Sequence, residues 1–168
     1  MEIVTGFRNE PHITSEQDRM MLRAIFGDES IVCNNGNQLE PELVSNNEIH
    51  IHDGAIVQQG CFGVIARNTY DAMTIENGSQ GMLRSDLIVS RYTKNADTGI
   101  ENMELVVLKG EESETAAVDP AYTTGSIDEG DLVDEFPLFR INLNGITVTS
   151  IDRLATPIKT MATSVHWK

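Results

Sequence analysis

Hydrophobic and polar residues alternate in short runs along most of the chain, with Gly, Asn and Asp between the runs. The strictest alternation is EIHIH at residues 48–52, followed directly by Asp53-Gly54 and a second apolar run at 55–58. Alternation with a period of two is typical of a half-buried strand, and Asp-Gly is a strong hairpin signal. The pattern therefore predicts a β-hairpin over residues 48–58 that turns at Asp53 and Gly54.

Further runs of this kind predict strands at 62–66, 72–76, 86–92, 103–110, 136–143 and 146–149, with Asn-Gly turns at 77–78 and 144–145. Roughly eight or nine short strands at intervals near ten residues are typical of a sandwich or small barrel. Helical segments do not alternate with the strands, which argues against a parallel sheet. We therefore expect a mainly β fold, an antiparallel β-sandwich or small barrel with one N-terminal α-helix. We expect one domain over residues 1–155 and a C-terminal tail over 156–168.

One segment, residues 13–27, carries a helical pattern. Thr14 with Gln17 three residues later is a capping-box signature, and Gly27 is a natural helix stop. A helix of this length is marginal in water, so we expect its apolar face to pack against another surface. That face comprises Met20, Met21, Leu22, Ala24, Ile25 and Phe26.

The formal net charge is −14, from 26 acidic and 12 basic residues. Such a field repels phosphate backbones and anionic membrane surfaces, so we expect no nucleic-acid partner. No apolar run is long enough to span a bilayer and the N-terminus has no signal-peptide pattern, so we expect no membrane insertion and synthesis in the cytoplasm. Cys33 and Cys61 lie in apolar runs without a CxxC motif and are expected to be small buried hydrophobes, with their redox state left open.

Residues 111–135 are acidic and contain few apolar side chains, which predicts a long solvated excursion between two core strands. Asp119-Pro120-Ala121-Tyr122 is typical of a turn, and we expect Tyr122 to pack and anchor the excursion. The carboxylates of this stretch are expected to be solvated, which disfavours an acid–base role; they include Asp128, Glu129, Asp131, Asp134 and Glu135. Divalent-cation binding by this stretch is a second interpretation.

His50 and His52 are the strongest candidates for a metal site. Two residues apart on a strand, their side chains point to the same face, and imidazole is a common ligand of zinc, iron and nickel. Two ligands do not complete a site, so a metal ion would need histidines from symmetry-related copies near a threefold axis. The alternative is that the two histidines have no metal-binding role, and that both rings lie on a solvated sheet face while Ile49 and Ile51 face the core. No other cofactor is expected.

The sequence contains no catalytic signature. No serine lies in a G-x-S-x-G context, no Walker or G-x-G-x-x-G motif is present, and no two carboxylates stand out as a glycosidase pair. We therefore predict no catalytic residues and a non-enzymatic protein. The alternative function is a carbohydrate-binding β-sandwich module. Its candidates for stacking against a sugar are Tyr70, Tyr122 and Trp167, together with Tyr92, which we expect in the core because its strand is apolar.

An ordered set of segments resembles small structural proteins of phages and prophages of Gram-positive bacteria. The segments are VTG (4–6), PHITS (11–15), IFG (25–27), IHIHDG (49–54), Gly60, RSDLIVSRY (84–92), LVVLKG (105–110), DPAY (119–122) and FPLFR (136–140). Together, over about residues 3–155, they look like the N-terminal shoulder domains of receptor-binding and baseplate proteins.

The resemblance implies a β-sandwich with an N-terminal helix, a homotrimer, no enzymatic activity and a place in the virion tail. It implies other tail and baseplate proteins as partners, and a host cell-surface glycan as a further one. The chain has no long fibre or head region after the shoulder-like part, which favours a tail-tip subunit or adaptor.

Overall fold

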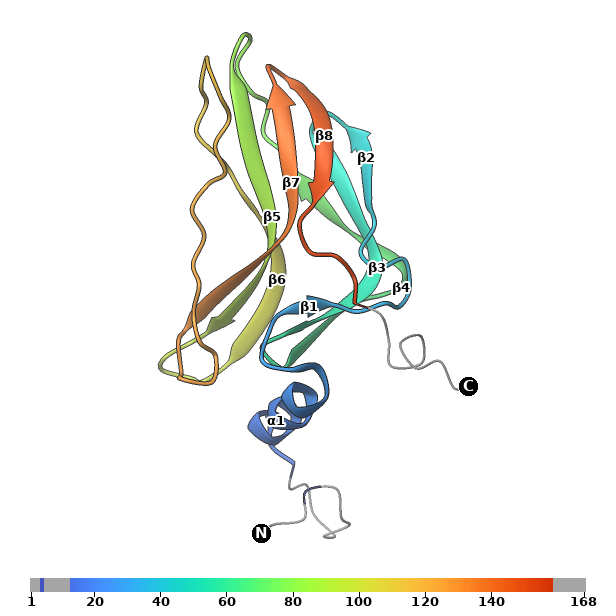
Figure 1. Cartoon of the computed structure of the whole chain (residues 1–168), viewed down its shortest axis with the longest axis vertical. Coiled ribbons are helices and arrows are strands. Elements are labelled where there is room, and N and C mark those ends of the chain that lie inside the picture. The colour runs from blue at the N-terminus through green and yellow to red at the C-terminus, as the bar shows by residue number, and fades with distance from the viewer. Residues whose placement is uncertain (1–3, 5–12, 159–168) are drawn as a thin grey trace, which may run out of the picture.

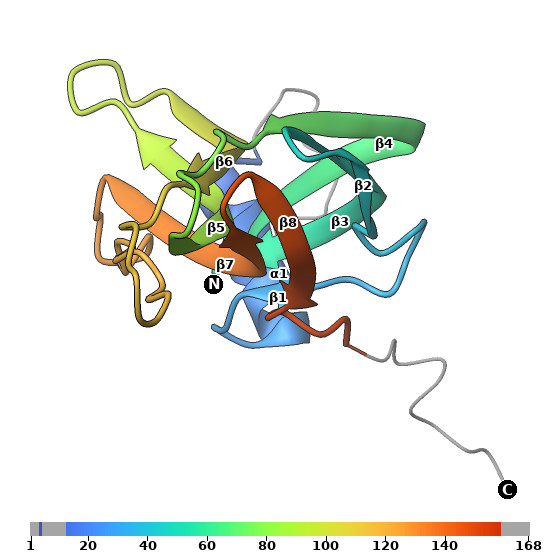
Figure 2. The ribbon, with the colours of Figure 1, turned by 90° about the horizontal axis from the view of Figure 1, so that it is seen from above.

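The chain forms two four-stranded antiparallel sheets packed face to face, with one helix at the end of the sandwich (Figures 1 and 2). The computed structural model describes Val4 and residues 13–158. Its elements are α1 (Ser15–Phe26), β1 (Ile31–Val32), β2 (Pro41–Ser45), β3 (Glu48–Gln58), β4 (Cys61–Thr74), β5 (Leu83–Lys94), β6 (Glu101–Leu108), β7 (Val133–Asn144) and β8 (Thr147–Arg153). The predicted fold class, a mainly β antiparallel sandwich with one N-terminal helix, is confirmed.

Sheet A consists of β1, β2, β3 and β4, with β3 at its centre. β4 pairs with one edge of β3 along its length, while β2 and β1 pair with successive parts of the other edge. β1 and β2 were absent from the sequence prediction because they are short and lack an alternating pattern of their own. Pairing with β3 is what defines them.

The predicted hairpin turn at Asp53-Gly54 is wrong. β3 runs without a turn through these residues, and the β3–β4 ladder instead shifts register there, with His52 opposite Tyr70 and Gly54 opposite Ile65. The chain reverses at Gln59-Gly60, where φ is 47° and 86°. Asp53 stays extended because its carbonyl accepts hydrogen bonds from the N–H groups of Asn37 and Leu39.

Sheet B has the strand order β6-β5-β7-β8. The predicted Asn144-Gly145 turn joins β7 to β8, with Gly145 at φ 58°. The inner faces of both sheets form the core, in which Ile49, Ile51, Ile88 and Phe139 are fully buried. The predicted inward direction of Ile49 and Ile51 is therefore confirmed.

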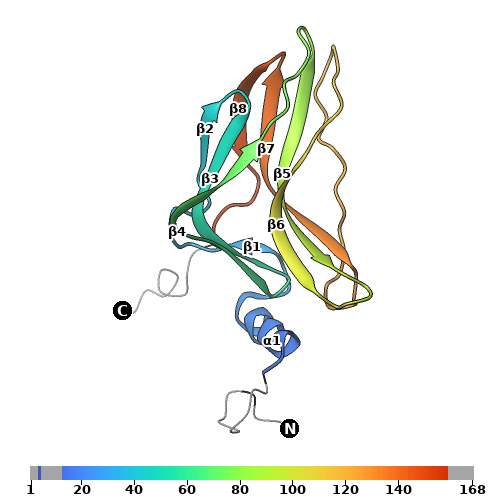
Figure 3. The ribbon, with the colours of Figure 1, turned by 180° about the vertical axis from the view of Figure 1, so that it is seen from behind.

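Residues 109–132 run along sheet B on the side away from sheet A (Figures 2 and 3). They help bury an outer layer that includes Leu87 and Val89, which are buried but lie outside the core between the sheets. The expected anchor, Tyr122, is about half exposed, so that prediction is wrong. Asp119 anchors the segment instead, by ion pairing with Arg140 and accepting a hydrogen bond from the Ser85 hydroxyl at 2.6 Å.

The predicted solvation of Asp134 and Glu135 is also wrong. Both belong to β7 and are buried. Asp134 accepts hydrogen bonds from the Gln58 amide at 2.7 Å and from Gly125 N at 2.9 Å, and Glu135 pairs with Arg91. These partners compensate for the loss of hydration of the two carboxylates.

The expected tail over 156–168 is attached at its start. Pro157 bridges to Val32, and Ile158 N donates to Val32 O at 3.0 Å. The rest of that tail, including Trp167, lies outside the described residues.

Candidate functional site

The helix α1 begins and ends on local signals. The Thr14 hydroxyl accepts a hydrogen bond from Gln17 N at 3.2 Å, and the Gln17 side chain accepts one from Thr14 N at 3.1 Å, so the predicted capping box is present. Glu16 and Asp18 lie in the first turn, where the helix dipole favours negative charge. Gly27, at φ 89°, ends the helix, and its N–H donates to Arg23 O.

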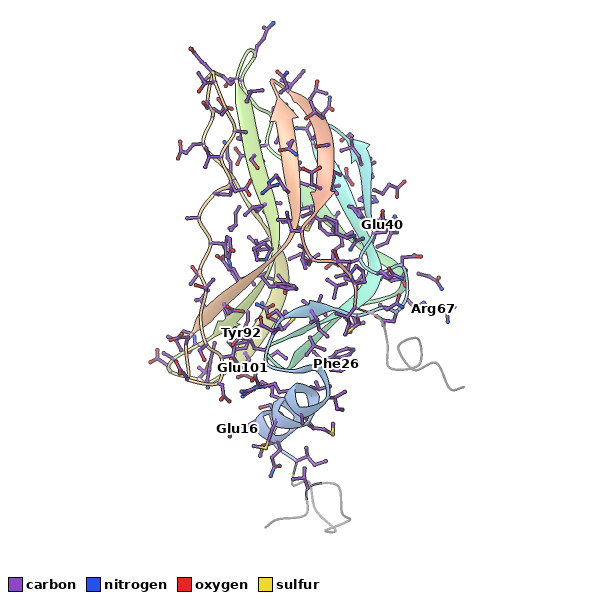
Figure 4. All side chains as sticks on the ribbon, in the orientation of Figure 1. Glu16, Phe26, Glu40, Arg67, Tyr92 and Glu101 are labelled. Carbon is purple, nitrogen blue, oxygen red and sulfur yellow. The ribbon has the colours of Figure 1, made fainter. Side chains whose placement is uncertain are left out.

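Ion pairs hold one side of α1 against the end of the sandwich. Arg19 Nη1 donates to both carboxylate oxygens of Glu101, at 3.1 and 2.9 Å, and the Tyr92 hydroxyl donates to Glu101 Oε1 at 2.7 Å. Figure 4 shows Tyr92 and Glu101 at the end of the sandwich that adjoins α1. Arg23 forms further ion pairs with Asp28 and Asp128. Sequence reasoning missed the Arg19–Glu101 pair because its members are 82 residues apart.

The charge states of this cluster are fixed near neutral pH. Burial raises the pKa of Glu101, but the hydrogen bond from Tyr92 and the positive charge of Arg19 outweigh it, so this pKa lies below its usual value. Burial, followed by the neighbouring Glu101 carboxylate, raises the pKa of the Tyr92 phenol. Tyr92 therefore stays a hydrogen-bond donor and Glu101 an acceptor. The cluster acts as a structural clamp.

A hollow of about 500 Å³ lies between α1 and the strands beside it. Its apolar lining includes Met21, Leu22, Phe62 and Met103. Cys61 also lines it, and burial raises the pKa of its thiol more than the nearby Arg19 lowers it. The thiol is therefore protonated and poorly nucleophilic at neutral pH.

The other side of α1 presents apolar side chains to solvent. Leu22 and Phe26 are partly buried toward the sandwich, whereas Met20, Met21 and Ile25 are 66%, 49% and 53% exposed. At ~100° per residue these three span an arc of about 140°, so they share one face. No residue of α1 is buried. The expectation that the apolar face packs against another surface is met only in part within the described residues.

The exposed apolar surface continues onto β4. Phe62 lines the same hollow as Met21 and is 57% exposed. We call the surface formed by Met20, Met21, Ile25 and Phe62 the end face. A helix face of this kind, adjoining a sheet edge, is suited to packing against another protein surface.

His50 and His52 lie on the outer face of sheet A. His50 Nε2 is 2.6 Å from Glu48 Oε1, and His52 Nε2 is 2.8 Å from Glu42 Oε2. The Tyr70 ring stacks on His50, with centroids 3.8 Å apart, and contacts His52 edge-on. The rings are therefore packed and paired with carboxylates, and they are less solvated than rings on a fully solvated sheet face would be.

The described part of the chain contains no group of three or more His, Cys, Asp or Glu side chains placed to hold a metal ion. His50 and His52 each contact a different glutamate, so one chain alone does not bring a third ligand to both rings. A metal ion shared between copies at these histidines stays a prediction, as does cation binding by residues 111–135.

The sugar-stacking candidates are divided among different surroundings. Tyr92 is buried, as predicted, and its hydroxyl belongs to the helix clamp. Tyr70 lies over the histidines, and Tyr122 lies on the 109–132 segment. The described candidates therefore form no single aromatic platform. Cys33 and Cys61 are free thiols and partly buried.

No protein-family model matches this sequence, and no curated protein matches it. Within residues 13–158, no helix is both long and apolar enough to cross a bilayer. The case for a function therefore depends on the surfaces described above and on the resemblance of the segments.

Proposed function

We propose that this protein is a non-enzymatic structural subunit that self-associates through its end face, in the tail tip or baseplate of a tailed phage or prophage. The main support for self-association is α1, a helix of 12 residues that has no buried residue and an apolar outward face. We favour a homotrimer that contacts neighbouring tail proteins. The subunit is made in the cytoplasm of the host bacterium and acts in the virion.

The energetics of α1 support assembly. An isolated helix of this length is marginal in water, and α1 is held to the rest of the chain by the ion pairs Arg19–Glu101 and Arg23–Asp128 without burying any of its residues fully. Fully burying a side chain such as Met or Ile stabilises by about 1.5–3 kcal/mol. Since about half of each outward side chain is exposed, covering it contributes about 1 kcal/mol per residue. A second copy, packed on the end face, would supply this burial.

The net charge limits where copies can meet. Each copy carries a formal charge of −14, so copies repel one another over most of their surfaces. The side chains that define the end face, Met20, Met21, Ile25 and Phe62, are all uncharged. Glu16 and Asp18 adjoin this face at the start of α1, whereas the side chains that make the contact carry no charge.

The biological setting comes from the resemblance. Three of its longer segments, RSDLIVSRY, LVVLKG and FPLFR, fall on β5, β6 and β7, which are adjacent strands of sheet B. The resemblance therefore concerns a contiguous part of the fold together with α1, and this supports a shoulder-type domain.

The proposal is tested by a triple variant, Met20→Ser/Met21→Ser/Ile25→Ser, examined by native mass spectrometry. These side chains face solvent, so we expect the variant to fold and to lose the oligomer seen in the unchanged protein. An oligomer that survives the triple substitution would show that the end face is not the interface.

The matched control is Val118→Ser/Ile146→Ser, because these apolar residues are also exposed and lie in other parts of the fold, Val118 in the 109–132 segment and Ile146 in the turn between β7 and β8. We expect this control to keep the oligomer. Loss of the oligomer in the control as well would mean that general surface hydrophobicity, and not the end face, drives association.

A further inference from the structure

A second, polar hollow of about 540 Å³ lies on sheet A, where the ladder between β3 and β4 opens. Between the pairs His52–Tyr70 and Gly54–Ile65, β3 contributes one residue and β4 contributes four. The extra residues of β4 bulge outward, with Asn68 at φ 61°. The segment between β1 and β2 forms the third wall, through Asn35, Gly36 and Asn37.

Asp53 is the buried polar residue of this hollow. It is 4% exposed, and its Oδ1 accepts a hydrogen bond from the Asn37 side-chain amide at 2.8 Å. No described residue donates a hydrogen bond to Oδ2, although a carboxylate can accept several. No buried side-chain oxygen of the described residues lacks a hydrogen-bond partner, so Oδ2 is the oxygen that reaches the hollow, where it can accept a hydrogen bond from a ligand hydroxyl.

Gly36 lets the loop lie directly over this carboxylate. A Cβ at position 36 would come within 3.2 Å of the Asp53 carbonyl oxygen and even closer to Oδ2. Gly36 also has φ 57°, a conformation that glycine adopts without strain. Asp53 is therefore fixed in place before any ligand arrives.

The rim supplies donors and an apolar patch. Asn35, Arg67 and Asn68 are exposed, and within the described residues their side chains make no hydrogen bond or ion pair. Arg67 projects outward at the side of the sandwich (Figure 4). Val64 adds an apolar surface that is 65% exposed.

The charges select the class of ligand. Asp53 and Arg67 are the only charged residues that line the hollow in the described chain, and their charges cancel. A divalent cation would find one carboxylate and an opposing guanidinium, which is a poor match for the several oxygen ligands it requires. A neutral ligand whose hydroxyls both donate and accept suits a carboxylate flanked by amides.

We infer that this hollow binds a neutral sugar ring. One hydroxyl donates to Asp53 Oδ2, a neighbouring hydroxyl accepts from the side-chain donors of Arg67 or Asn68, and an apolar C–H face of the ring lies on Val64. The volume is within the range of small-ligand sites. All the lining residues come from one chain, so this site does not depend on the proposed assembly.

The test is saturation-transfer difference NMR on the full chain, with the methyl pyranosides of glucose, galactose, mannose and N-acetylglucosamine as probes. We expect at least one probe to bind, and Asp53→Asn to weaken it about tenfold or more because the carboxylate that accepts from the sugar hydroxyl is replaced by an amide. The matched control, Asp97→Asn, changes an exposed carboxylate in the turn after β5 and should leave binding unchanged.

Further variants protect the test against misfolding of Asp53→Asn. Arg67→Ala and Asn68→Gly change exposed rim residues, and glycine accepts the positive φ of Asn68. Both should weaken the same probe while the thermal unfolding midpoint stays unchanged. No binding by any of the four probes, or equal binding by all variants, would overturn the inference. A further result would also overturn it: if calcium chloride, added alone, shifted the NMR signals of Asn37 and Asn68 while the pyranosides did not, the hollow would be a cation site.

Discussion

At the scale of single residues, the buried ion pair Arg84–Asp86 in β5 connects the segment before β5, at residues 76–77, with the segment after β6, at residue 110. Arg84 donates to both carboxylate oxygens of Asp86, at 2.8 and 2.9 Å, and to the carbonyl oxygens of Glu76 and Asn77. Asp86 also accepts a hydrogen bond from Gly110 N at 2.9 Å. The hydrogen bonds of this pair therefore hold both segments against β5.

Removing one partner should leave the other as an uncompensated buried charge. We expect Arg84→Met to lower the free energy of unfolding by about 3–5 kcal/mol, measured by urea denaturation. Lys109→Met removes the exposed ion pair with Glu76 and should cost less than about 1 kcal/mol. Equal losses for the two variants would contradict a structural role for the buried pair.

Asp119 gives the molecule an acid-sensitive contact. The hydrogen bond from Arg140, with a smaller contribution from Ser85, holds its pKa below the ordinary value of 3.8. A carboxylate with a lowered pKa in the folded state stabilises the fold fully above its ordinary pKa, and this stability is lost as the pH falls through the lowered value. The thermal midpoint should therefore fall below about pH 3.8, and Asp119→Asn should flatten that fall. As a control, Asp97→Asn changes an exposed carboxylate and should leave the dependence of the thermal midpoint on pH unchanged. If the midpoint of Asp119→Asn fell as steeply with pH as that of the unchanged protein, Asp119 would not be the cause of the acid sensitivity.

Residue-scale predictions from sequence were weakest where acidic side chains are buried. Asp134 and Glu135 belong to an acidic run and were expected in solvent, but their partners Gln58 and Arg91 come from strands that are distant in the sequence. The predicted turn at Asp53 is wrong for the same reason, because the hydrogen bonds that keep Asp53 extended come from residues 37–39, which are distant in the sequence. Composition alone does not reveal such partners.

At the scale of elements, the long connection over 109–132 is seated on sheet B at Gly110. A Cβ at this position would lie 2.0 Å from the Ser85 carbonyl oxygen and 3.3 Å from that of Val118. The connection can approach β5 only because residue 110 has no side chain.

Gly110→Ala should push the connection away from β5 and break the hydrogen bond to Asp86. We expect a loss of about 1–3 kcal/mol in unfolding free energy and faster amide exchange in residues 111–119. Gly99→Asn is a suitable control, because no atom lies within 4 Å of the added Cβ and asparagine tolerates its φ of 69°. Unchanged exchange in Gly110→Ala would contradict this seating.

Element prediction succeeded at some local signals, but the predicted turn at Asn77-Gly78 is wrong, because the chain turns at residues 80–81 instead. The capping box, Gly27 and the Asn144-Gly145 turn act within a few residues, and all three are present in the structure. The Asp53-Gly54 signal failed because pairing of β3 with three other strands outweighs a local turn preference. The end face was beyond sequence reasoning, since the split of the apolar residues of α1 into inward and outward sets depends on where the helix docks.

At the scale of the whole molecule, the proposed assembly face and the proposed ligand site share no lining residue. The end face comprises α1 and the start of β4, whereas the polar hollow lies where the β3–β4 ladder opens. The carboxylates spread over the remainder give each copy its charge of −14. The two surfaces are neighbours on β4, because Phe62 of the end face and Val64 of the hollow are two residues apart and lie on the same side of the strand.

Self-association is the central claim, and the mass of the full chain in solution tests it most directly. Size exclusion coupled to light scattering should be run at about 0.15 M salt, where repulsion between copies is screened beyond about 8 Å. We predict a mass near three times 18.5 kDa. Twice 18.5 kDa would keep self-association and contradict the trimer, and a single species of 18.5 kDa would contradict the proposed assembly itself.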